Sequence, residues 1–301
     1  MTPRSILVTG ASGFVGLHLI RLLLARGYAV TALDLGARPN LPPEVDFRSV
    51  DLRDAGSLAE LPRTWDGVIH LAGASIPSLF ATPAPVLLNL ELTLNLLNHL
   101  QDSRVLLVSS SHVYGPSPTR CKESDPIAPQ GLYGLSKHLV EQVAPHYQER
   151  LEVRVARPFN HLGPGLRPEL MVPSLLRRLA ALPEDGSPVR MEGLNSTRDF
   201  IDVRDVAEAY LAILELEAPA HRTFNVCTGQ GHSIEAVVLA AMALLGRVRP
   251  VQFRDRPNSS GDIPYLVGDP DRLTAAGWRA RHTLSDSLSS MIHDPSHGGT
   301  P

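Results

Sequence analysis

The amino-terminal part of the fold is set by the stretch Ser5-Ile6-Leu7-Val8-Thr9-Gly10-Ala11-Ser12-Gly13-Phe14-Val15-Gly16. Its first five residues form a β-branched apolar run typical of a buried strand, and residues 14–20 repeat apolar side chains at the helical period. Gly10 permits a tight turn, Gly13 lets the backbone approach a pyrophosphate, and Gly16 lets the helix pack close to the strand. The N–H groups at the start of such a helix attract anions. The stretch therefore predicts a strand, turn and helix that hold a dinucleotide phosphate.

Strands and helices alternate through the rest of the chain. The strands are expected at residues 5–9, 28–34, 47–50, 67–73, 104–108, 151–157 and 223–226. Helices are expected to begin at residue 14 and to span residues 85–101, 134–147, 203–216, 233–245 and 284–292. This order predicts an α/β fold with a doubly wound parallel sheet.

The chain is expected to form two packed domains. Residues 1–157 and parts of 200–230 would make the larger one, whereas residues 158–199 and 231–293 would make a smaller, mixed α/β substrate domain. Residues 294–301 are expected to be a frayed tail.

Composition excludes several classes of protein. The 301 residues carry a net charge of −3 and a pI near 6.5, so no basic surface for nucleic acid or an anionic membrane is expected. No apolar run reaches the roughly 18 residues of a membrane span, and the start of the chain does not resemble a secretory signal. Cys121 and Cys227 suggest neither a disulfide framework nor a metal site. A cytoplasmic location is expected.

The second strand ends in a carboxylate that bears on the choice of dinucleotide. Asp34 stands 18 residues after Gly16, close to where a carboxylate accepts hydrogen bonds from the adenosine ribose. This position favours NAD. Arg38 could instead meet the 2′-phosphate of NADP, so NADP remains an alternative.

Tyr133 and Lys137 are four residues apart in a helical run, so their side chains share one face. A nearby lysine favours the phenolate, and we expect it to lower the tyrosine pKa from about 10. The strand at 104–108 ends in the hydroxyl cluster Ser109-Ser110-Ser111, at the sheet edge where ligands bind. Together these residues predict proton transfer to a carbonyl.

Taken together, these motifs resemble the extended short-chain dehydrogenase/reductases. The resemblance implies a Rossmann-type fold and a homodimer, in agreement with apolar residues beyond one face of the helices at 86–101 and 134–147. It also implies that Ser110 binds the substrate carbonyl, Tyr133 passes the proton, and Lys137 binds the nicotinamide ribose. The cofactor-binding residues so implied are Gly10, Ser12, Gly13, Phe14, Val15, Gly16, Asp34, Asp51, Leu52, Leu71, Ala72, Gly73, Ser109, Tyr133, Lys137 and Pro158.

Three later segments look like the nucleotide-sugar branch of that family, close to the GDP-mannose 4,6-dehydratases and GDP-6-deoxy-4-keto-mannose reductases. They are residues 157–165, residues 197–206, and Arg256-Pro257 with Asp262. The substrate-binding residues so implied are Ser110, Ser111, Asn160, Arg198, Arg256 and Asp262.

The residue chemistry suits a nucleoside-diphosphate sugar as the small-molecule partner. Arg198 and Arg256 can each donate two parallel hydrogen bonds to phosphate, and Asp262 can accept from a ribose diol. Alternatively, Arg198 pairs with Asp199 or Asp202. The branch usually has Gly-Asn-Leu where this chain has residues 193–195 as Gly-Leu-Asn, so GDP, dTDP and UDP all stay open.

Position 112 bears on the reaction. By resemblance, this position corresponds to a glutamate in the dehydratases and to a cysteine in a fucose-forming epimerase–reductase. In this chain the residue is His112. We therefore expect reduction of a 4-keto-6-deoxy sugar, with hydride going to C4 and Tyr133 donating the proton. His112 either lines the pocket or moves protons as an acid–base catalyst. The alternatives are a nucleotide-sugar epimerase with bound NAD and a non-catalytic NAD(P)-binding sensor or scaffold.

Overall fold

The structure is a computed structural model of the chain. It describes residues 4–36, 38, 41–183, 187–193, 196–247, 249–255 and 263–294.

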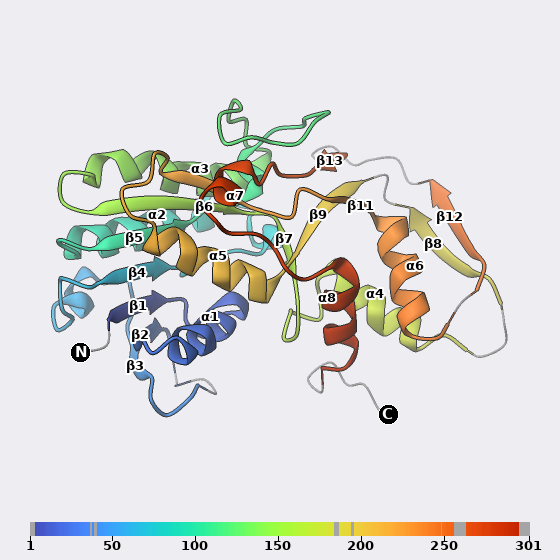
Figure 1. Cartoon of the computed structure of the whole chain (residues 1–301), viewed down its shortest axis with the longest axis horizontal. Helices are drawn as coiled ribbons and strands as arrows, with labels where there is room; N and C mark the ends of the chain where they lie inside the picture. Colours follow the sequence, from blue (N-terminus) through green and yellow to red (C-terminus); the bar gives the residue numbers. More distant parts are fainter. Residues whose placement is uncertain are drawn as a thin grey trace.

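A seven-stranded parallel sheet forms the larger part of the molecule, with strand order β10-β6-β5-β4-β1-β2-β3 (Figure 1). Its strands are β1 (Ser5–Thr9), β2 (Ala29–Asp34), β3 (Asp46–Ser49), β4 (Gly67–His70), β5 (Arg104–Val108), β6 (Glu152–Pro158) and β10 (Thr223–Val226). The sequence predicted all seven strands, and the predicted doubly wound fold is confirmed. Parallel strands bring their carboxyl ends to one edge, so the residues that follow β1, β2, β4, β5 and β6 gather there.

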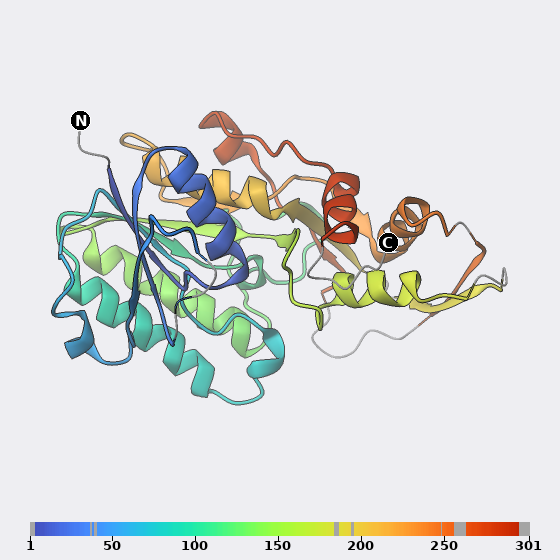
Figure 2. The same cartoon turned by 90° about the horizontal axis from the view of Figure 1, so that it is seen from below.

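Helices cover both faces of this sheet. Helices α1 (Phe14–Ala25) and α5 (Val203–Glu215) pack together on one face, and α2 (Ala84–His99) and α3 (Gly131–Val143) pack together on the other, as Figure 2 shows. Each face has its own apolar core. The helix α3 is therefore fixed against the sheet along its length, and it brings residue 133 to the carboxyl edge of β5.

Smaller sheets lie beyond that edge. Strands β7 (Asn160–Leu162), β9 (Thr197–Asp202), β11 (Gly231–Ser233) and β13 (Tyr265–Leu266) form one, and β8 (Val189–Gly193) pairs with β12 (Val251–Asp255) in parallel. Helices α4 (Met171–Ala180), α6 (Ile234–Leu244) and α8 (Leu284–Ile292) share a third apolar core with these strands. The sequence did not predict α4, β8 or β12.

The division into two domains stays a prediction, and one segment that it placed in the smaller domain packs against the large sheet. Helix α7 (Asp271–Ala275) contacts β10, and Leu273 and Trp278 lie in the core between α1, α5 and the large sheet. The expected boundary had placed both residues in the smaller domain. The chain thus returns to the large sheet before it ends in α8.

No helix in the described part of the chain combines the length and the apolar character that crossing a bilayer requires. Cys121 and Cys227 are both buried and free, and burial raises the pKa of each thiol. Neither has the low pKa of a reactive thiol.

Candidate active site

The glycine turn lies against the backbone that follows β4. A Cβ atom added to Gly10, whose φ is +67°, would stand 2.6 Å from the Ala72 nitrogen, and one added to Gly16 would stand 2.6 Å from the Ala11 carbonyl oxygen. Helix α1 begins after Gly13, and no described side chain caps it there. Its first N–H groups are thus left for an anion, which is the arrangement that a dinucleotide pyrophosphate requires.

Asp34 at the end of β2 faces this turn. Its Oδ2 accepts the Ser12 main-chain N–H at 2.8 Å and a short hydrogen bond from the Ser12 hydroxyl. Arg38 turns away, because its guanidinium donates to the carbonyl oxygens of Val45 and Pro42 at 3.0 and 2.6 Å. A carboxylate therefore faces the turn where the sequence predicts the adenosine ribose, and the nearby cation has other acceptors.

Asp51 and Leu52, which were expected to bind the cofactor, make contacts within the chain. Arg53 forms a two-pronged contact with Asp51, and its hydrogen bonds lower the pKa of that carboxyl group. Leu52 is buried, and its carbonyl oxygen accepts a hydrogen bond from Asn95.

The segment 71–73 is fixed by groups that the sequence did not reveal. Thr9 Oγ1 accepts the Ala72 N–H at 3.3 Å, and a Cβ atom on Gly73 would stand 2.7 Å from the Asn89 amide oxygen. Asn89 also donates to the Ser136 hydroxyl on α3 at 2.8 Å. One buried amide on α2 thus joins the end of β4 to the helix that carries Tyr133.

Four predicted catalytic residues come together at the ends of β5 and α3. Ser110 is close enough to the Tyr133 hydroxyl to lower its pKa, and the Ser110 Oγ lies 3.3 Å from His112 Nδ1. Ser110 Oγ accepts the His112 main-chain N–H at 3.2 Å. Lys137 Nζ donates to the Val108 carbonyl oxygen at 3.1 Å. Hydroxyl, phenol and ammonium therefore surround one small region at the sheet edge.

An aromatic side chain that the sequence did not single out completes this group. Phe80 meets the Tyr133 ring edge-on with centroids 5.3 Å apart, and His112 does the same from a second direction at 5.3 Å. The two contacts fix the plane of the phenol.

The ionisation of Tyr133 differs from the expectation. Burial raises its pKa, while the hydrogen bond with Ser110 acts in the opposite direction. Burial also lowers the pKa of Lys137 to about 8. The expectation that Lys137 lowers the Tyr133 pKa is wrong for this structure, because burial dominates and the ammonium is bonded to the Val108 carbonyl oxygen.

His112 is neutral at physiological pH. Burial lowers its pKa to about 4, and the positive charge of Arg198 adds to that effect. Arg198 on β9 therefore lies within electrostatic reach of the His112 ring, and it also donates to the Thr197 carbonyl oxygen at 3.1 Å.

The carboxylates next to Arg198 have other partners. Asp199 accepts hydrogen bonds from Thr228, Gly229 and Gly268, and Asp202 pairs with Arg204 at 2.7 Å. Both carboxylates are therefore bound by groups other than Arg198, and these contacts do not support the alternative in which Arg198 pairs with Asp199 or Asp202.

The remaining predicted residues fall into three groups. Asn160 begins β7 beside β9, Ser111 is buried in the turn, and Pro158 ends β6. Ser109, expected at the cofactor, donates its hydroxyl to Glu141 on α3 at 2.5 Å. Arg256 and Asp262 lie outside the described residues.

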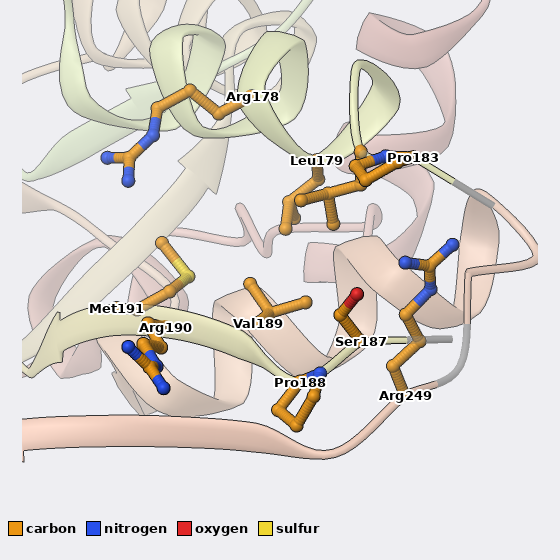
Figure 3. Close-up of a pocket in the computed structure, with 10 residues that line it drawn as sticks. Arg178, Leu179, Pro183, Ser187, Pro188, Val189, Arg190, Met191 and Arg249 are labelled. Atoms are coloured by element: carbon orange, nitrogen blue, oxygen red, sulfur yellow. The ribbon is translucent and has the colours of Figure 1, made fainter. Parts of the chain in front are cut away.

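A cavity of about 250 Å³ lies elsewhere, between α4, β8 and Arg249 (Figure 3). It contains no predicted site residue. The side chains of Arg178, Arg190 and Arg249 extend in different directions around it, so they do not converge on one anion (Figure 3). The candidate active site is therefore the hydrogen-bonded group at the large sheet's edge.

Known proteins are similar to this chain in sequence and in architecture. GDP-6-deoxy-D-mannose reductase of Pseudomonas aeruginosa is 33% identical, over 98% of this chain and 97% of that protein. The structure of RMD from Pseudomonas aeruginosa complexed with NADPH matches with a TM-score of 0.78 at 30% identity, over 95% of this chain and 97% of the other. The UDP-glucose 4-epimerase of Thermus thermophilus in complex with NAD gives the same TM-score, identity and coverage.

The glycine turn, the uncapped start of α1 and the Tyr133–Lys137 pair fit the nicotinamide dinucleotide that these structures contain. The model of the NAD dependent epimerase/dehydratase family matches residues 6–227. The resemblance to the extended short-chain dehydrogenase/reductases is confirmed, and this chain belongs to the NAD-dependent epimerase/dehydratase family.

Proposed function

We propose that this protein is an NAD(P)-dependent reductase of a nucleoside-diphosphate 4-keto-6-deoxyhexose, with a GDP-sugar as the first candidate. The observation that carries the proposal is the grouping of Ser110 and Tyr133 around His112, beside the buried Lys137. A ketone oxygen placed between the Ser110 and Tyr133 hydroxyl groups would accept a hydrogen bond from each of them. The similarity to a GDP-6-deoxy-D-mannose reductase supports the choice of sugar.

Each residue has a distinct role in this proposal. The raised pKa keeps the Tyr133 phenol protonated at neutral pH, so it can give its proton to the ketone oxygen. Because the Ser110 oxygen already accepts the His112 N–H, its own proton is available to donate to the same oxygen. Lys137, with a pKa of about 8, is mostly charged at pH 7, and we assign it to binding the nicotinamide ribose. Bound NADH or NADPH supplies the hydride.

The state of His112 argues against sugar dehydration. That reaction needs a strong base beside the ketone, and a neutral imidazole with a pKa of about 4 is a weak one. We therefore assign His112 to the pocket wall, where its ring supports Tyr133 and its N–H holds Ser110.

The test is a panel of GDP-, dTDP- and UDP-linked 4-keto-6-deoxyhexoses, each with NADH and with NADPH. Absorbance at 340 nm measures reduction, and NMR of the product gives the configuration at C4. We expect loss of absorbance with at least one of these sugars and none without it. Absence of turnover with the whole panel would refute the reductase proposal.

The second candidate is a nucleotide-sugar 4-epimerase, and the similarity to the Thermus thermophilus enzyme favours it. An epimerase would convert UDP-glucose or a related sugar with no net change in absorbance at 340 nm. The same NMR measurement detects this conversion. A protein that binds NAD(H), converts no sugar and is unaffected by Tyr133→Phe would instead be a sensor or scaffold.

We also propose a homodimer in the cytoplasm. Leu87 on α2 is 66% exposed and Leu135 on α3 is 37% exposed, and these two helices pack side by side. A partner copy could cover both leucines in a four-helix contact. Sedimentation velocity at micromolar concentration checks this, and Leu87→Glu should shift the protein toward monomer.

A further inference from the structure

One buried ion pair holds both ends of the catalytic turn. Ser110 stands at the start of the short 3₁₀ turn η3 (Ser111–Val113), with Ser109 before it and Tyr114 after it. The Ser109 hydroxyl donates to Glu141 Oε1 at 2.5 Å. Arg157 Nη1 donates to the Tyr114 hydroxyl at 2.9 Å. The two flanking residues therefore depend on one pair of charged side chains, Glu141 and Arg157.

The pair itself is a two-bond fork. Arg157 Nε lies 2.9 Å from Glu141 Oε1, and Arg157 Nη2 lies 2.6 Å from Glu141 Oε2. Both side chains are 7% exposed. Burial alone would lower the pKa of Arg157, but its hydrogen bonds to Glu141 outweigh burial and raise it. Two parallel charge-assisted bonds fix orientation as well as distance, so the pair is a rigid reference for its neighbours.

The pair joins the turn to the helix that carries the acid. Tyr133, Lys137 and Glu141 are spaced four residues apart on α3 and share one face. Lys137 bonds to the carbonyl oxygen of Val108, and Glu141 bonds to the hydroxyl of Ser109. The last residue of β5 and the residue after it are thus tied to successive turns of α3. The separation of Ser110 from Tyr133 follows from these two attachments.

The polar groups on the Tyr114 side of the network also have hydrogen-bond partners. Tyr114 donates its hydroxyl to the Asn225 side-chain oxygen at 2.7 Å, and the Asn225 side-chain amide donates to the Cys121 carbonyl oxygen at 2.8 Å. The Arg157 guanidinium also lies over the Tyr114 ring, 5.0 Å from its centroid. A fully paired buried network is stiff, because moving one member breaks several bonds at once.

We infer that Glu141 and Arg157 are positioning residues for the reaction, acting through Ser109 and Tyr114 to place Ser110 against Tyr133. This role rests on the chemistry proposed above for Ser110 and Tyr133. Neither residue of the pair contacts the substrate. Their loss therefore reduces kcat while leaving the binding of sugar and cofactor in place, because small errors in alignment cost much in rate and little in affinity.

The decisive variants cut the outer bonds and leave the ion pair intact. Ser109→Ala frees one end of the turn, and Tyr114→Phe frees the other. The matched control is Ser103→Ala, since Ser103 stands at the opposite end of β5, is 5% exposed and also makes two hydrogen bonds, with Gln101 and Trp65. All three variants remove one buried hydroxyl.

We expect kcat to fall at least about 10-fold in Ser109→Ala and Tyr114→Phe, with the sugar KM and the NADH Kd within about twofold of wild type. Ser103→Ala should change none of the three by more than about twofold. Equal loss of kcat in Ser103→Ala, or a rise in KM with kcat unchanged, would overturn the positioning role.

A second measurement needs no substrate, and it separates failure of this role from failure of the proposed reductase activity. Crystal structures of Ser109→Ala and Ser103→Ala should show Ser110 Oγ displaced from Tyr133 in the first variant alone. If wild type reduces no sugar in the panel, the reductase proposal fails and these structures still decide the positioning role. An undisplaced Ser110 in Ser109→Ala would overturn it.

Discussion

The main-chain N–H of Ser12 lies 2.8 Å from Oδ2 of Asp34, so the glycine turn and the end of β2 share one carboxylate. In the proposed cofactor site this carboxylate would face a 2′-phosphate, and like charges repel. We predict that Asp34→Ser improves the NADPH Kd relative to the NADH Kd by at least about 10-fold, which corresponds to about 1.4 kcal/mol. Quenching of protein fluorescence by each cofactor measures both constants without a sugar.

The matched control for this change is Arg38→Gln. Since the Arg38 guanidinium is held by the carbonyl oxygens of Pro42 and Val45, we expect the NADPH Kd of that variant to stay near wild type. A large loss of NADPH affinity in Arg38→Gln would mean that Arg38 leaves those carbonyls to bind the phosphate.

Removing the Tyr133 hydroxyl tests the proposed proton donor. We predict that Tyr133→Phe lowers kcat by about 10² to 10⁴, because a positioned general acid contributes that much. The cofactor Kd should change little, since Phe keeps the ring contacts with Phe80 and His112. Tyr147→Phe is the control, as its hydroxyl bonds to Asn98 away from the site. Full activity in Tyr133→Phe would exclude this residue as the acid.

Substitution of His112 tests whether this residue lines the pocket wall or acts as an acid–base catalyst. We predict that His112→Gln lowers kcat by less than about 10-fold, because the main-chain N–H that holds Ser110 is retained, whereas loss of a general base costs about 10² or more. The pH profile of kcat should also keep its shape. A loss above about 100-fold together with a missing acidic limb would reassign His112 to proton transfer at a carbon.

Buried histidines should make the fold sensitive to acid. Burial, with a further contribution from Lys137, lowers the pKa of His70 to about 3. The unfolded chain binds a proton near pH 6.5, so the free energy of unfolding falls as the pH drops from about 6.5 toward 3. At pH 5 this amounts to about 2 kcal/mol. Asp199 acts in the opposite sense, because burial raises its pKa.

Urea unfolding at pH 7.5 and pH 5 measures this effect. We expect His70→Asn to be less stable than wild type at pH 7.5, since His70 bonds to Thr9 and Thr93, but to lose less stability between the two pH values. His146→Asn, at an exposed position, should match wild type in both respects. Equal pH dependence in wild type and His70→Asn would contradict the assignment.

The sequence predicted the large sheet because its strands are short apolar runs that need no partner to be recognised. It also located Ser110, Tyr133 and Lys137, since their spacing is local. It did not reveal Asn89, Phe80 or Glu141, whose importance lies in contacts with residues between 15 and 53 positions away. Residues 189–191 and 251–253 alternate apolar and polar side chains as a half-buried strand does, but both runs are short, so their pairing shows only in the structure.

Arg154 tests how much a buried cation contributes to the free energy of unfolding. Its side chain is fully buried at the end of α5, where the guanidinium donates to the carbonyl oxygens of Ile213, Leu214 and Leu216 at 2.5 to 2.6 Å. These carbonyls have no further helical turn to bond with. We predict that Arg154→Met lowers the free energy of unfolding by about 3 kcal/mol, because it leaves buried acceptors unpaired.

Arg150→Met is the matched control, since Arg150 caps the end of α2 through Leu97 and Asn98 but is partly exposed, so water can replace it. Its cost should stay below about 1 kcal/mol in the same urea titration. Because Arg154 lies far along β6 from Pro158, the sugar KM and the cofactor Kd of Arg154→Met should match wild type in conditions where the variant is folded. A similar loss of stability in both variants would show that burial adds nothing to this type of cap, and the account of the α5 terminus would then be wrong.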